Sequence, residues 1–239
     1  MAPMILDQYF PFQAFALPNS YLSMLPECDA RSLYYGHDAF YVNAAHTLNQ
    51  LVTTHRLTDY SLIEILTAAN INLPAAQLTR LRDAAGSVYN HQLYFDGLTC
   101  AKGQPPIIRV TEAIIAAYGS TENFRRMVTE AAASIVGSGW VWLVFEKNRG
   151  LHLVTTANNQ TVDLTSVTPI LNLDMWEHAY IRRHPFNQAA YVDDWFSLIN
   201  WSSAETRYMT ATGQLEEGTA PSAPPSPAAA PAAPRLPAT

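Results

Sequence analysis

The chain has 239 residues, of which 49% are hydrophobic and only 14% are charged, with a net charge of −6 at pH 7. This length allows one large or two small domains with buried cores. The negative charge and the lack of a basic stripe argue against nucleic acid or an anionic membrane as a partner.

The first half of the chain predicts an extended arm followed by a helical hairpin. Prolines punctuate residues 1–30, and an amphipathic pattern then predicts a helix over Asp38–Val52. A shorter helix is expected over Asp59–Ala69, and Pro74 fits the first turn of a long helix over 74–95. The apolar face of the first helix consists of Phe40, Ala44, Leu48 and Leu51. Helices joined by modest connections favour an antiparallel hairpin.

The second half predicts a domain with a small sheet. Residues 103–106 are Gly-Gln-Pro-Pro, a sequence that interrupts helices and strands. We therefore expect a domain boundary there, between an N-terminal domain (1–103) and a C-terminal domain (107–210). Ser120 is a plausible N-cap for the second helix of this domain. Helices are expected at Val110–Tyr118, Thr121–Val136, Tyr191–Ile199 and Ser203–Tyr208. Strands are expected at Trp140–Phe145, Leu151–Thr156 and Ile170–Asp174. The fold class is therefore α+β, with a three-stranded antiparallel sheet.

The remaining segment, residues 212–239, is rich in proline and alanine. Of its last 20 residues, 15 are Ala or Pro, a composition that cannot build a core and predicts a disordered spacer. The two cysteines, Cys28 and Cys100, give no disulfide framework and no metal-binding spacing. Neither a secretory signal nor an apolar run of membrane-spanning length is visible, so we expect a cytoplasmic protein with no membrane partner.

Three residues have the chemistry of a metal site. Asp174 and His178 lie four positions apart just after a predicted strand, so that a carboxylate and an imidazole can converge on one ion. His91 lies within the long helix of the first half, where a single histidine is usually an ordinary polar residue. Taken with the other two, it completes a set of nitrogen and oxygen donors that suits Fe or Mn.

The stretches around these residues resemble the iron/manganese superoxide dismutase family, from about Leu17 to Tyr208. The matching stretches are Val88–Phe95, Gly137–Leu143, Thr155–Asn158, Asp174–Tyr180, Asp194–Phe196 and Asn200–Trp201. The resemblance implies two domains with one Fe or Mn ion per subunit between them, bound by three histidines and one aspartate. It also implies superoxide as the small substrate, which is converted to O2 and H2O2.

The resemblance further implies a homodimer. In it Glu177 would reach His178 of the partner subunit. The residues that the resemblance places around the metal or at the subunit contact are Trp140, Asn159, Trp176, Glu177 and Tyr180.

The chain departs from the family at the first metal ligand. An ungapped alignment places Gly36, Phe40 and Ala44 where the family has the ligand histidine, a second histidine and a gate tyrosine. The family's solvent-binding glutamine is also absent, with Ser87 and Asn159 at its two possible positions. The second tyrosine of the family's E-H-A-Y-Y string is Ile181. We therefore expect the ion to be weakly held or lost, and dismutation weakened or lost; the alternative is a non-catalytic scaffold or assembly protein.

His37 is a candidate substitute for the missing ligand. It lies about 100° around a helix from Gly36, so it would need a one-residue slip or a local bulge, which a glycine could permit. A competing alignment places His37 on the family's second histidine and Tyr41 on its gate tyrosine. That alignment still leaves Leu33 at the ligand position.

Overall fold

The computed structural model describes residues 7–17, 35–100 and 107–214. The predicted domain boundary at 103–106 and most of the Pro/Ala-rich tail lie outside these ranges. The helices of the first half are the π-helical segment Tyr35–Tyr41, α2 (Val42–His55), α3 (Leu62–Thr67) and α4 (Ala75–Asp96). Those of the second half are α5 (Ile108–Tyr118), α6 (Thr121–Ser134), α7 (Glu177–Tyr180), α8 (Gln188–Leu198) and α9 (Trp201–Ala211).

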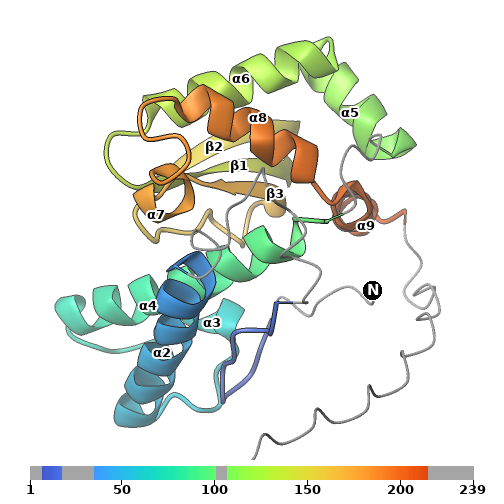
Figure 1. Ribbon diagram of the computed structural model, residues 1–239. Helices are drawn as coiled ribbons and strands as arrows, with labels where there is room; N and C mark the ends of the chain where they lie inside the picture. Colours follow the sequence, from blue (N-terminus) through green and yellow to red (C-terminus); the bar gives the residue numbers. More distant parts are fainter. Residues whose placement is uncertain (1–6, 18–34, 101–106, 215–239) are drawn as a thin grey trace, which may run out of the picture.

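Three strands form one antiparallel sheet, which confirms the predicted α+β class. The strands are β1 (Gly139–Glu146), β2 (Gly150–Ala157) and β3 (Thr168–Asp174), in the order β2-β1-β3. The β1–β2 hairpin closes with Gly150 at a φ of 78°, a left-handed conformation that glycine adopts without strain. Helices α5, α6 and α8 cover one face of the sheet, and α4 lies on the opposite side beside β3 (Figure 1).

Local sequence signals explain the helix starts. The Ser120 hydroxyl accepts a hydrogen bond from the backbone N–H of Asn123 at 3.0 Å, so the predicted N-cap of α6 is present. Ser61 and Glu64 form a reciprocal capping box at the start of α3. This cap starts α3 at Leu62, three residues later than the pattern of apolar residues predicts.

The first helix differs from the prediction in both shape and register. It opens as the π-helical segment Tyr35–Tyr41, whose wider turns hold more residues than an α-helix. The residues that it and α2 bury on their inner face include Tyr41, Ala45, Leu48 and Val52. The predicted apolar face is therefore wrong at Phe40, which is 41% exposed. Two adjacent faces of this helical segment carry apolar side chains. Packing against the rest of the protein determines which of the two faces is buried.

The N-terminal segment 7–17 is fastened to the helical half by side-chain amides. Asn49 on α2 donates to the carbonyl of Phe12 and accepts from its N–H, each at 2.8 Å. The Phe12 ring is buried in the core. Asp7 accepts the backbone N–H of Ile63, which satisfies one free donor in the first turn of α3.

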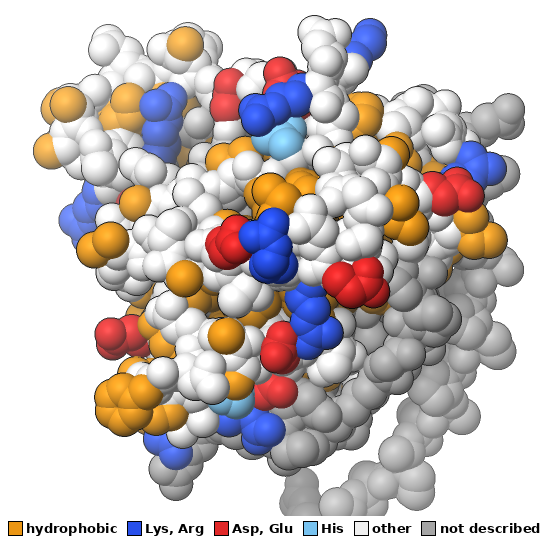
Figure 2. All heavy atoms as spheres, turned by 90° about the horizontal axis from the view of Figure 1, so that it is seen from above, with side chains coloured by type: hydrophobic (Ala, Val, Ile, Leu, Met, Phe, Trp, Pro, Cys, Tyr) orange, Lys and Arg blue, Asp and Glu red, His pale blue; other side chains and the backbone are white. Residues whose placement is uncertain are grey.

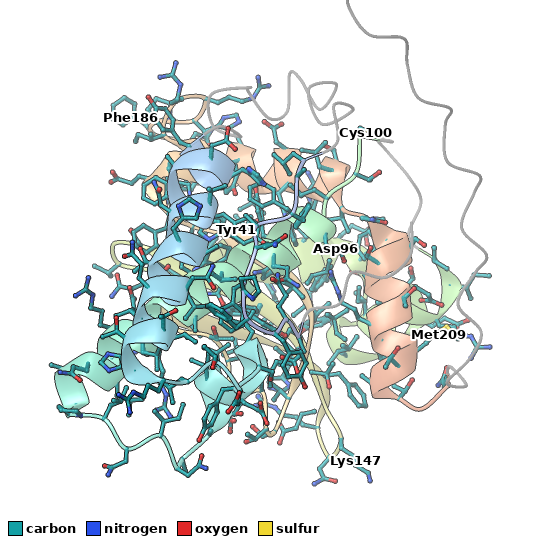
Figure 3. The ribbon with its side chains drawn as sticks, turned by 90° about the horizontal axis from the view of Figure 1, so that it is seen from below. Tyr41, Asp96, Cys100, Lys147, Phe186 and Met209 are labelled. Carbon is teal, nitrogen blue, oxygen red and sulfur yellow. The ribbon has the colours of Figure 1, made fainter. Side chains whose placement is uncertain are left out.

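A buried ion pair joins the two halves of the molecule. Arg207 on α9 binds Asp96 at the end of α4, and its second terminal nitrogen donates to the carbonyl of Ile170 on β3 at 2.9 Å. Figure 3, which labels Asp96, shows it beside α9. Arg207 thus connects the helical half to the sheet. A charge buried in this way depends on its partner, because the unpaired ion would keep its full desolvation cost.

On the face seen in Figure 2, acidic and basic side chains are interspersed among uncharged ones. The exposed pair Arg125–Asp193 is one of several ion pairs on the surface. Within the described ranges, none of the helices has the length and hydropathy needed to cross a bilayer.

We expect Asp96→Ala to lower the free energy of unfolding by about 3 kcal/mol, because it leaves the Arg207 guanidinium buried without its counter-ion. Urea titration followed by circular dichroism measures this. Asp193→Ala is the matched control, since it removes an exposed ion pair and should cost less than about 1 kcal/mol. Equal losses for the two variants would contradict the assigned role of Asp96.

Candidate metal centre

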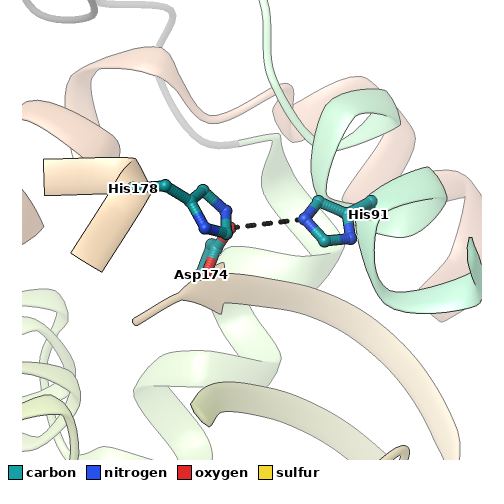
Figure 4. A group of neighbouring side chains, drawn as sticks. All are labelled: His91, Asp174 and His178. Carbon is teal, nitrogen blue, oxygen red and sulfur yellow. Dashed lines mark hydrogen bonds and ion pairs between the residues drawn. The ribbon is translucent and has the colours of Figure 1, made fainter. Parts of the chain in front are cut away.

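Three side chains from three elements converge at the junction of the two halves. His91 comes from α4, Asp174 from the end of β3 and His178 from α7 (Figure 4). Each offers one donor atom, and these atoms all lie within 4.8 Å of one another. The side chains are 2%, 1% and 7% exposed, respectively. The structure therefore brings together the three residues that the spacing and the resemblance single out.

The ring of His91 is oriented by its own helix. Its Nδ1 donates to the carbonyl of Ser87 one turn earlier, at 2.8 Å. That bond fixes the proton on Nδ1 and leaves the lone pair of Nε2 free, facing Asp174 Oδ2 at 3.8 Å. Burial lowers the pKa of His91 to about 4, although Asp174 opposes the shift. The imidazole is therefore neutral at pH 7, the form that binds a metal ion.

Asp174 and His178 are held relative to each other by short contacts. His178 Nε2 lies 3.0 Å from Asp174 Oδ2, and the other carboxylate oxygen accepts the backbone N–H of Trp176 at 2.8 Å. The backbone carbonyl of Asp174 accepts the Tyr191 hydroxyl of α8 at 2.8 Å. The end of β3 is thereby fixed from both sides. One carboxylate oxygen, Oδ2, faces both imidazoles.

The residue before His91 docks α4 against the sheet. Asn90 is fully buried, and its backbone carbonyl accepts the side-chain amide of Asn172 on β3 at 2.8 Å. Its own side-chain oxygen accepts the hydroxyl of Thr161 at 2.8 Å. One turn earlier, a Cβ at Gly86 would lie only 2.0 Å from the carbonyl oxygen of Asn159. The sequence does not predict these contacts, and its one signal for them is an amide residue directly before His91.

Two buried nitrogen atoms around the site have no hydrogen-bond partner within the described residues: His91 Nε2 and Trp140 Nε1. The Trp140 ring lies edge-on to His91 with 5.1 Å between centroids, and the Tyr41 ring is nearly parallel to His91 at 6.0 Å. Burial also raises the pKa of the Tyr41 hydroxyl above its ordinary range. Each unsatisfied buried group costs about 1–3 kcal/mol. A cation held by the neutral His91 nitrogen and the Asp174 carboxylate fits this arrangement.

Gly36 lies beside His178, one of the three donor residues. A Cβ built there would lie 3.9 Å from His178 Nε2 and 3.5 Å from the Phe95 ring, both ordinary van der Waals distances. A side chain at this position would therefore start beside the donor cluster without a clash. The residue that the ungapped alignment puts at the position of the missing family ligand therefore lies beside the donor cluster.

His37 does not join the three donors in this structure. Its Nδ1 lies 2.6 Å from a carboxylate oxygen of Asp38, and its Nε2 lies 2.6 Å from the carbonyl of Phe15. Both ring nitrogens thus face oxygen acceptors away from the cluster. The π-helical segment is a local irregularity of the kind that His37 would need to act as the substitute ligand. It nevertheless turns the His37 ring toward the N-terminal segment 7–17. His37 connects that segment to the first helix.

The other residues expected near the metal are placed as follows. Trp140 is buried against His91, while the Trp176 indole donates to the carbonyl of Asn158 at 3.3 Å. Asn159 donates its amide to Asp83 at 3.3 Å, so the amide does not reach the donors. Tyr180 is buried and its hydroxyl accepts from Gln188, whereas Glu177 is exposed.

Comparison with known proteins gives consistent matches. Residues 106–207 match the family described as "Iron/manganese superoxide dismutases, C-terminal domain". The chain is 31% identical over 190 residues to an iron superoxide dismutase of Escherichia coli (strain K12), covering 80% of this chain and 94% of that protein. It is 29% identical over 202 residues to a manganese superoxide dismutase of Thermus aquaticus, covering 84% and 99%. A manganese superoxide dismutase of Leptolyngbya boryana is 28% identical over 197 residues, covering 82% and 79%.

We expect His37→Ala to destabilise the fold by about 1–3 kcal/mol, because it leaves the Phe15 carbonyl without its donor. Metal content after incubation with Fe(II) or Mn(II) should equal that of the wild type. His46→Ala, which alters an exposed histidine of α2, is the control and should change neither quantity. A folded His37→Ala protein that no longer takes up metal would identify His37 as a ligand after all.

Proposed function

The chain belongs to the iron/manganese superoxide dismutase family, and on this premise we propose that it is a metalloprotein with a reduced set of ligands and weak dismutase activity. The observation that carries the proposal is the convergence of three donor atoms beside a glycine. Named relatives carry iron or manganese. His91, Asp174 and His178 would hold one such ion per chain.

Superoxide dismutation converts two superoxide anions and two protons into O2 and H2O2. A bound Fe or Mn ion supplies the one-electron chemistry by alternating between its +2 and +3 states. The residues of this chain would contribute two imidazoles and one carboxylate, and the carboxylate would partly balance the charge of the ion. Two histidines and one carboxylate can bind a divalent metal, though with fewer donors than the family's four.

The surroundings of the donors favour weakened activity. The residues at the two glutamine positions do not serve the centre: the Ser87 hydroxyl is 3.5 Å from the outer nitrogen of His91, and Asn159 binds Asp83. Phe40 is apolar where the family has a histidine. Groups that orient metal ligands and bound solvent typically change affinity or activity by about 10–100-fold when lost. The loss of a ligand adds to this effect.

A non-catalytic scaffold is the second candidate. The same apolar replacements, Phe40 and Ala44, favour it, because a protein retained for its fold does not need proton donors around the metal. Measuring Fe and Mn in the purified protein together with superoxide consumption on the same sample separates the two. Bound metal with slow dismutation supports the metalloprotein. If the protein binds no Fe or Mn after loading, the non-catalytic scaffold is the candidate function that remains.

We also propose that the chain forms a homodimer through the surface around Glu177, His178 and Tyr180. Glu177 is exposed next to His178, whose side chain is only 7% exposed. Apolar side chains lie nearby in the chain: Ile181 is 38% exposed and Phe186 is fully exposed. Figure 3, which labels Phe186, shows it projecting from the edge of the molecule. Exposed apolar groups beside a buried donor are consistent with a covered surface.

Light scattering at micromolar concentration should give twice the 26.4 kDa mass of the chain. Glu177→Ala should shift the population toward monomer, because it removes the acceptor proposed to reach the partner's His178. Glu130→Ala on α6, an equally charge-changing variant at an exposed position, should leave the mass unchanged. A monomeric wild type would contradict the proposed dimer.

Gly36→His should raise metal affinity by about tenfold or more, because it adds an imidazole beside the three donors. Gly36→Ala is the matched control: it adds the Cβ, which the site accommodates, but no donor atom. Competition with a chromophoric chelator measures both affinities. Equal affinities for the two variants would show that position 36 does not face the bound ion.

A further inference from the structure

Exposed isoleucines gather on α5. Of the ten large hydrophobic side chains that are exposed among the described residues, three belong to α5 or its N-cap: Ile107, Ile108 and Ile115. Ile108 is 71% exposed and Ile115 is 45% exposed. These two lie seven residues apart, close to two helical turns, so they share one face of α5. This face is apolar and is not covered by the described part of the chain.

A hollow lies beside the isoleucine face, where α9 ends; we call it the α5 groove. It has a volume of about 590 Å³ and is lined by Ile108 and neighbouring residues of α5, by Tyr208 of α9 and by Gln214. Helix α9 packs beside α5 (Figure 1). The Arg109 guanidinium on α5 donates to Gln214 Oε1 at 2.6 Å. The described part of the chain therefore ends at the α5 groove.

The sequence beyond Gln214 repeats proline at a spacing of three residues. One set stands at 221, 224 and 227, and a second set stands at 231, 234 and 237. A polyproline II helix has three residues per turn, so in that conformation each set lies along one edge. Residues 218–234 have no charged side chain, so burying them against an apolar surface desolvates no ion. Such a segment builds no core of its own but has the composition of an extended ligand for a groove.

The first set of prolines can reach the α5 groove. Residues 215–220 separate it from Gln214, and six extended residues span roughly 20 Å. Helix α5 is about 16 Å long, and residues 221–227 would span about 22 Å in polyproline II conformation. A short tether gives an effective concentration on the order of mM, above that of a second copy of the chain at micromolar concentration. Connectivity therefore favours the tail as the occupant.

We infer that residues 221–227 dock in polyproline II conformation on the α5 groove of their own chain, with prolines against Ile108, Ile115 and the ring of Tyr208. Polyproline II segments bind against aromatic rings, and Tyr208 supplies one at the groove. The Arg109 guanidinium offers further donors to backbone carbonyls, which this conformation leaves without internal partners. The docked segment would cover the isoleucine face. The inference is independent of the proposed metal function.

Photo-cross-linking in the full chain tests this contact. The photoreactive residue p-benzoylphenylalanine replaces Ile108, and mass spectrometry identifies the peptides that are joined on illumination. An equilibrated mixture of isotope-labelled and unlabelled protein distinguishes contacts within one chain from contacts between two. We expect cross-links from position 108 to residues 221–227 of the same chain. The same probe at Val136, which is 97% exposed after the end of α6, is the control and should give none with the tail.

Proline substitutions test which segment docks. The combined change Pro221→Gly, Pro224→Gly and Pro227→Gly should lower the cross-link yield about tenfold, because glycine raises the entropy cost of ordering the segment. The corresponding change of the three prolines at 231, 234 and 237 is the matched control. It should leave the yield unchanged.

A second probe at Ile115 repeats the test without altering Ile108. Cross-links from either position to residues 221–227 within one chain would support the inference. Cross-links to another chain would identify a second copy as the occupant of the isoleucine face and would overturn it. It would equally be overturned if neither probe reached the tail, or if the probes reached the second set of prolines instead of the first.

Discussion

The buried carboxylate of Asp174 is the constraint on which the junction of the two halves depends. A carboxylate with only 1% of its side chain exposed is costly unless nearby groups compensate its charge. Here the compensation comes from the Trp176 backbone N–H and the His178 imidazole, with His91 facing the same oxygen. The Asp174 carboxylate and the imidazoles of His178 and His91 belong to β3, α7 and α4, respectively, so these three elements must meet at one point. The Asn90–Asn172 contact and the Asp96–Arg207 pair hold α4 against the sheet in that position.

Local signals in the sequence predicted much of the fold. Alternating and helical periodicities located the three strands and the long helix α4, and Ser120 marked the start of α6 correctly. The chain spacing of Asp174 and His178, with the family resemblance, singled out a cluster that the structure brings together. The π-helical segment could not be predicted, because it depends on packing rather than on local preference. The same applies to Phe40: the pattern placed it on the buried face, yet its ring lies against His178 and partly in solvent. His37 was an attractive substitute by chain distance alone, but its direction is set by the Phe15 carbonyl.

Residues of the first helix shape the surroundings of the cluster together. Gly36 offers no side-chain donor beside it, and Phe40 places an apolar ring over His178. Tyr41, turned inward by the π-helical segment, packs parallel to His91. Aromatic rings therefore surround much of the cluster. Such surroundings strengthen electrostatic attraction between an ion and the buried carboxylate, because the local dielectric constant is low.

We propose that this chain offers a metal ion two imidazoles and one carboxylate, with the position beside Gly36 left without a protein donor among the described residues. X-ray absorption spectroscopy of the Fe-loaded protein tests it most directly, because multiple scattering from imidazole rings counts the histidines bound to the metal. We predict two histidine ligands, with oxygen donors completing the shell. Three histidine ligands would contradict the account, since a further histidine would then have to reach the ion.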